Sequence, residues 1–136
     1  VDSDRTSRAR GGDGETVDAW EIIQPDEESR TFLDALYAEL PQLACRLSLE
    51  TADLLLGYVP ELSAPEIAPR PVLLIHGEND QLVPPSESES LVAAIGESAR
   101  LVSVPEMAHF DWARPGDDRY EKVLETIEEW LKELGR

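Results

Sequence analysis

The sequence predicts an α/β fold in which a parallel sheet is flanked by helices. Residues 71–76, Pro-Val-Leu-Leu-Ile-His, form a continuous apolar run, which is typical of a strand buried on both faces of such a sheet. Residues 100–104 form a second short strand. A helical pattern lies between the two strands and another follows the second. The order strand, helix, strand, helix predicts a βαβα unit, and we expect its crossover to be right-handed.

Local signals predict where the two helices of this unit begin. Ser86 and Glu89 have the spacing of a capping box, and Asp118 and Glu121 fit an N-cap with its partner three residues later. The last helix carries apolar residues at intervals of three, four and seven. We expect this stripe to be core. Its members are Tyr120, Val123, Leu124, Ile127, Leu131 and Leu134.

The chain divides into three predicted segments. Residues 1–16 are polar and glycine-rich without a period, which is typical of a flexible tail or linker. Residues 17–69 form a helical lid or connector region, in which one helix starts near Pro25 and ends at Pro41, and Ser48 can cap another. Residues 70–136 form the C-terminal βαβα unit.

Composition excludes several classes of function. The net charge of −17 argues against binding to nucleic acid or to an anionic membrane surface. Of the 12 basic residues, only Lys122 and Lys132 are lysines, so a halophilic source stands beside a merely acidic protein from a GC-rich genome as a hypothesis. No membrane-length apolar run and no secretory leader is visible, and we expect a cytoplasmic protein. The single cysteine, Cys45, excludes an internal disulfide and is expected to be a buried, inert thiol.

Two chemically capable residues follow the two predicted strands. Asp80 lies in the loop after the first strand, and His109 lies after the second, 29 positions further on. Ligands and catalytic groups of open α/β sheets collect at the carboxyl ends of the strands. A histidine base needs a carboxylate that holds its second ring nitrogen. The pair could serve that purpose, whereas Asp80 or His109 taken alone would more simply be a turn aspartate and a loop histidine.

The string around these residues resembles the end of the α/β-hydrolase superfamily, serine esterases and peptidases included. In that superfamily a strand ending in His-Gly-x-x-Asp, here residues 76–80, is followed by Val-Pro, here Val83 and Pro84. The resemblance implies that Asp80 is the triad acid and that His109 is the catalytic base. Ala108 stands where the superfamily usually has a glycine before the histidine, which we interpret as a tolerated change.

Four neighbouring residues have secondary interpretations. His76 ends the first strand and is expected to pack or to support the site rather than to act as the base. Glu78 is the competing acid and is expected to face solvent or the rim of the sheet. Phe110 and Trp112 lie next to the base and are candidate substrate-binding residues, although ordinary loop packing would explain them equally well.

The nucleophile of this superfamily is absent from the sequence. None of the serines lies in a Gly-x-Ser-x-Gly string, so we expect a C-terminal part of the fold that is incomplete without another chain or segment. The predicted function is hydrolysis of an ester, amide or related acyl bond in a small-molecule substrate, with the serine and oxyanion hole supplied by that partner. No cofactor or metal is implied. The alternatives are a non-catalytic binding module on the same scaffold and an acyl- or carbon–carbon-cleaving variant.

Overall fold

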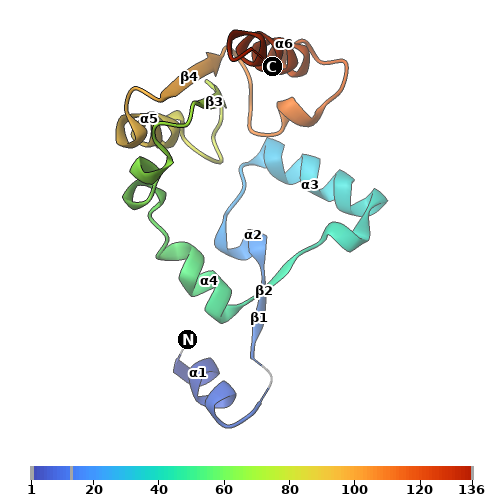
Figure 1. The fold of residues 1–136 in the computed structure, drawn as a ribbon. Helices are drawn as coiled ribbons and strands as arrows, with labels where there is room; N and C mark the ends of the chain where they lie inside the picture. The colour runs from blue at the N-terminus through green and yellow to red at the C-terminus, as the bar shows by residue number, and fades with distance from the viewer. Residues whose placement is uncertain (1, 13, 136) are drawn as a thin grey trace. The chain divides into compact units, whose positions relative to one another are not determined.

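The computed structural model describes residues 2–12 and 14–135, and it divides into two compact units, Val1–Tyr58 and Val59–Arg136. The division falls at Tyr58, inside the segment 17–69 that the sequence predicts as one region. Figure 1 shows the order of helices and strands along the chain. Among the helices formed by residues 2–12 and 14–135, none has both the length and the hydropathy of a membrane-spanning segment.

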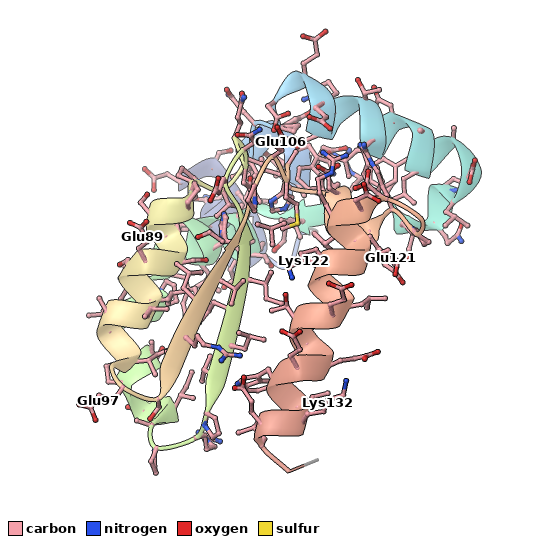
Figure 2. All side chains as sticks on the ribbon, turned by 90° about the horizontal axis from the view of Figure 1, so that it is seen from above. Glu89, Glu97, Glu106, Glu121, Lys122 and Lys132 are labelled. Atoms are coloured by element: carbon pink, nitrogen blue, oxygen red, sulfur yellow. The ribbon has the colours of Figure 1, made fainter. Side chains whose placement is uncertain are left out.

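The second unit contains the predicted βαβα arrangement. Strand β3 (Val72–Gly77) leads through helix α5 (Pro85–Ile95) to strand β4 (Ala99–Val104), and helix α6 (Asp118–Glu133) follows. The two strands pair in parallel, from Val72 opposite Ala99 to Gly77 opposite Val104. Figure 2 shows α5 on one side of these strands and α6 on the other. The chain therefore has the fold class that the sequence predicts, a parallel sheet flanked by helices.

The burial of this unit is lower than the sequence suggests. Residues 72–76 of β3 are half-buried rather than covered on both faces, because β4 is the one strand that pairs with β3 in the described chain. On α6, Leu124 and Ile127 from the predicted core stripe are exposed to 39% and 36%. The buried apolar residues of the unit are few and lie mainly where its elements meet: Ala64, Ile95, Val104 and Met107.

The helix starts in this unit differ from the predicted caps. Helix α5 begins at Pro85 after Pro84, with no capping side chain, so the Ser86 capping box is wrong. Proline fixes φ and needs no hydrogen-bond acceptor for its missing N–H, which suits it to the first helical position. Helix α6 is capped by Asp117, one residue earlier than predicted, and its side chain accepts from the Arg119 N–H at 2.9 Å.

The first unit pairs two short antiparallel strands, β1 (Thr16–Asp18) and β2 (Arg46–Ser48). The helices of this unit are α1 (Asp2–Ala9), α2 (Ala19–Ile22), α3 (Glu27–Glu39) and α4 (Leu49–Leu56), and it has a 3₁₀ turn at Pro41–Leu43. The 3₁₀ turns of the second unit are Pro60–Leu62, Ala64–Ile67 and Asp111–Ala113. Ser48 caps α4 as predicted, accepting from the Thr51 N–H at 3.1 Å. Cys45 is exposed, so the expectation of a buried thiol is wrong.

Helix α1 differs from the flexible tail expected over residues 1–16. Its polar sequence has no apolar period, but the Asp4 carboxylate is buried and organises the segment. Asp4 accepts from the Glu15 N–H at 2.6 Å and pairs with Arg8 one helical turn later at 3.0 Å. The Glu15 hydrogen bond, with help from Arg8, lowers the pKa of Asp4. Polar side-chain contacts, which apolar periodicity does not reveal, therefore account for this helix.

Candidate active site

Asp80 lies in the turn after β3 and is held by the backbone. Its Oδ1 accepts from the N–H groups of Leu82 at 3.0 Å and Val83 at 2.8 Å. The side chain is only 6% exposed. These two hydrogen bonds orient the carboxylate through Oδ1. The other oxygen, Oδ2, faces His109 in the loop that follows β4.

His109 contacts Asp80 in the manner that the sequence predicts. Its Nδ1 donates to Asp80 Oδ2 at 2.8 Å, and its side chain is 27% exposed. This contact fixes the neutral tautomer with the proton on Nδ1 and leaves the Nε2 lone pair available. Chemically, the arrangement can take a proton at Nε2 while a carboxylate stabilises the imidazolium that forms.

Backbone hydrogen bonds join the two loops that carry these residues. Glu78 N–H donates to the Val104 carbonyl at 3.0 Å, and Asn79 N–H donates to the Met107 carbonyl at 3.1 Å. Gly77 permits this close approach, because a Cβ at this position would lie 2.1 Å from the Met107 carbonyl oxygen. The glycine of the His-Gly-x-x-Asp string is therefore required by packing against the His109 loop.

His76 lies next to Asp80, and its side chain is only 10% exposed. Its Nε2 donates to the Val83 carbonyl at 2.9 Å and lies 3.3 Å from Asp80 Oδ2, and its Nδ1 is 2.7 Å from the Ser88 hydroxyl. In the neutral ring, the Nε2 proton faces acceptors and Nδ1 accepts from Ser88. Both nitrogens are thus occupied within the fold, which agrees with the supporting role expected for His76.

The other predicted residues occupy distinct positions. Glu78 is exposed, as expected of the competing acid, and the structure does not bring its side chain into the pair. Phe110 packs edge-on against His109, with ring centroids 4.7 Å apart and an interplanar angle of 90°. Trp112 is 53% exposed. A role of Phe110 or Trp112 in substrate binding stays a prediction. In the described ranges, no group of three or more potential ligands could hold a metal ion.

Residues 55–135, which include both Asp80 and His109, match the model of the prolyl oligopeptidase family. The chain belongs to the prolyl oligopeptidase family. Among its relatives, the uncharacterized protein YfhR of Escherichia coli strain K12 is 32% identical over 98 residues, covering 70% of this chain and 34% of the relative. The uncharacterized protein Rv2307c of Mycobacterium tuberculosis strain H37Rv is 43% identical over 58 residues, covering 43% of this chain and 21% of the relative.

A solved structure supports the same fold. The chain is similar to the α/β-hydrolase GrgF from Penicillium sp. sh18, with a TM-score of 0.72 and 18% identity, over 96% of this chain and 46% of that one. This confirms the predicted resemblance to the α/β-hydrolase superfamily and a hydrolase-type scaffold. The chain spans about a third of the length of the E. coli relative that it matches.

In this member of the prolyl oligopeptidase family, sequence reasoning missed two residues that contact the His109 loop. Asp111 is completely buried and accepts from the Ala108 N–H, and Arg119 at the start of α6 lies 2.7 Å from Asp111. Arg119 also pairs with Asp117, and these hydrogen bonds lower the pKa of the Asp117 carboxyl to about 2. The sequence does show an aspartate, Asp111, two positions after His109, but only its burial in the structure reveals that it supports the loop.

Proposed function

We propose that this chain supplies the acid and the base of a serine hydrolase that cleaves ester, amide or related acyl bonds. The observation that carries the proposal is the 2.8 Å hydrogen bond between His109 Nδ1 and Asp80 Oδ2, formed after two adjacent parallel strands. Family membership and the hydrolase scaffold support it.

In the proposed reaction, His109 Nε2 takes the proton from a serine hydroxyl while the serine oxygen attacks the acyl carbon. The protonated His109 then donates this proton to the leaving group. The bond between the acyl carbon and the leaving group breaks, and an acyl–serine ester remains. A water molecule, deprotonated by His109, then attacks the acyl–serine ester; the serine leaves with the proton from His109, and the acid product is released. Asp80 keeps the ring in the required tautomer and stabilises its charged form. The substrate in this proposal is a small molecule with an acyl group, and Phe110 and Trp112, which lie close to His109 in sequence, are the candidates to contact it.

The serine and the oxyanion hole come, in this proposal, from a partner chain or from a further segment of the same protein. The length of the relatives supports this view, since the described chain corresponds to about a third of YfhR. The half-buried β3, with its unpaired edge within the described ranges, also supports it. A parallel strand with an open edge is normally paired in a complete α/β sheet.

The test uses the complete protein, with a fluorophosphonate probe that labels activated serines. We expect labelling at a Gly-x-Ser-x-Gly serine, and Asp80→Asn should reduce its rate by roughly 10³- to 10⁴-fold, because the tautomer lock is lost. Glu78→Gln is the matched control, since it makes the same type of change two residues away at an exposed carboxylate. A folded protein that binds acyl ligands but is never labelled would instead indicate the binding module.

A further inference from the structure

The loop after β4 buries a carboxylate two residues beyond His109. Asp111 has no exposed surface, and a carboxylate is buried at a high cost unless it is paired and hydrogen-bonded. Its Oδ2 accepts from the Ala108 N–H at 2.8 Å and lies 2.7 Å from Nη1 of Arg119, while Arg114 lies 3.3 Å from its Oδ1. The buried carboxylate is therefore hydrogen-bonded to the backbone N–H of Ala108, the residue immediately before His109.

Arg119 connects this carboxylate to the first turn of α6. Its Nε and Nη2 pair with the two oxygens of Asp117 at 2.7 and 2.6 Å, which orients the guanidinium plane. Nη1 reaches Asp111 at 2.7 Å and also donates to the Glu106 carbonyl at 3.2 Å. A planar guanidinium has donors in a fixed fork and can hold these three acceptors together, which a lysine cannot.

The Glu106 contact occurs at an unusual backbone conformation. Glu106 has φ of 58°, and it is the one residue other than glycine with positive φ in the described chain. Such a conformation is uncommon for a residue with a side chain and needs support from its surroundings. Arg119 therefore holds the loop before His109 at Glu106 and, through Asp111, at Ala108 (Figure 2 labels Glu106 at the end of the unit where α6 begins).

We propose that Asp111 and Arg119 are positioning residues that hold the Glu106–Asp111 loop so that His109 Nδ1 meets Asp80. Neither side chain touches the reacting atoms in this proposal. They act through the backbone on both sides of the base, and their meaning for catalysis rests on the proposed hydrolase function.

The test compares two arginines in the complete protein. Arg119→Lys keeps the charge but removes the fork, and we expect kcat to fall roughly 10- to 100-fold, because the base is displaced. Arg100→Lys is the matched control. Arg100 pairs with Glu133 of α6 at 2.9 Å in an exposed ion pair. It lies at the start of β4, whereas the His109 loop follows the other end of that strand, so its substitution should leave kcat nearly unchanged.

A second readout does not need activity. The ring nitrogens of His109 are labelled with ¹⁵N, and the Nδ1 proton shared with Asp80 is followed by NMR. We expect its signal to broaden or shift in Arg119→Lys and in Asp111→Asn, and to remain in Arg100→Lys. If Asp111→Asn does not fold, Arg119→Lys decides, because its side chain is one-third exposed and its charge is kept.

An unchanged Nδ1 signal in Arg119→Lys would overturn the proposal, whether kcat falls or not, because the position of the base would then not depend on Arg119. An equal loss in Arg100→Lys would also overturn it, because the effect would then follow any weakened contact with α6. A changed signal in a protein that is inactive even as wild type would support the positioning role while removing the proposed hydrolase function.

Discussion

At the scale of single residues, Asp80 has both carboxylate oxygens bonded, one to two backbone amides and one to His109. His76 also approaches Asp80 Oδ2, but its stronger contacts are with the Val83 carbonyl and Ser88. The two histidines therefore differ in accessibility. The ring of His76 is enclosed by its partners, whereas His109 has one nitrogen left for a substrate or a nucleophile.

This difference predicts unequal effects on catalysis. On an activated ester, His109→Ala in the complete protein should lower kcat by roughly 10³-fold or more, since the base is removed. His76→Ala should lower kcat much less, because it removes a support and not the proton acceptor. Steady-state kinetics with equal amounts of folded protein measure both. A full loss from His76→Ala combined with none from His109→Ala would show that the base is misassigned.

At the scale of elements, the site depends on how closely the end of β3 approaches the loop after β4. The Asn79 N–H and the Met107 carbonyl form part of this contact, and Gly77 makes room for it. The proline start of α5 and the Asp117 cap of α6 then fix where each helix leaves these loops. The catalytic candidates are thus placed by the ends of the elements rather than by the strands themselves.

Gly77→Ala tests this close approach. The added methyl would lie 2.1 Å from the Met107 carbonyl oxygen, so the His109 loop must move, and we expect a loss of about 3 kcal/mol or more in unfolding free energy. Urea unfolding of the complete protein measures the loss. Gly57→Ala is the control, because its Cβ would meet its nearest atom at an ordinary 3.5 Å, and its effect should stay within about 0.5 kcal/mol. Equal effects would show that the close contact is absent in solution.

At the scale of the whole molecule, the main features are the excess of acidic residues and the apolar side chains that remain exposed. The chain carries 29 acidic and 12 basic residues, and several ion pairs, such as Arg100–Glu133, lie at the surface. Leu124 and Ile127 on α6 remain exposed, and so does much of α4. These exposed apolar residues favour the proposal that a further segment or chain completes the fold.

The charge predicts a response to salt. Mutual repulsion among the acids opposes the compact state, and salt screens it, since the Debye length falls from about 10 Å at 0.1 M to about 3 Å at 1 M. The melting temperature of the complete assembly should therefore rise from low to molar potassium chloride. The control replaces the exposed Glu89, Glu97 and Glu129 by glutamine, which should reduce the gain (Figure 2 labels the first two). A melting temperature of the unmodified protein that stays constant or falls as the salt concentration rises would remove the halophile hypothesis.

The sequence by itself determined the fold class and the pair at the centre of the site. The apolar run of β3, the second strand and the helical periods specify a βαβα unit, because their periodicity reflects local geometry. Asp80 and His109 follow successive parallel strands, and such strands end at the same edge of a sheet, so their contact could be predicted at a separation of 29 positions.

Only the tertiary structure decided what surrounds this pair. The burial of Asp111, the fork of Arg119 and the positive φ of Glu106 depend on how a loop folds against α6, and no residue spacing encodes that. Helix α1 depends in the same way on a buried carboxylate at Asp4. Periodicity reports which faces are apolar, whereas polar contacts between distant residues arise only when the backbone has brought them within about 3 Å of one another.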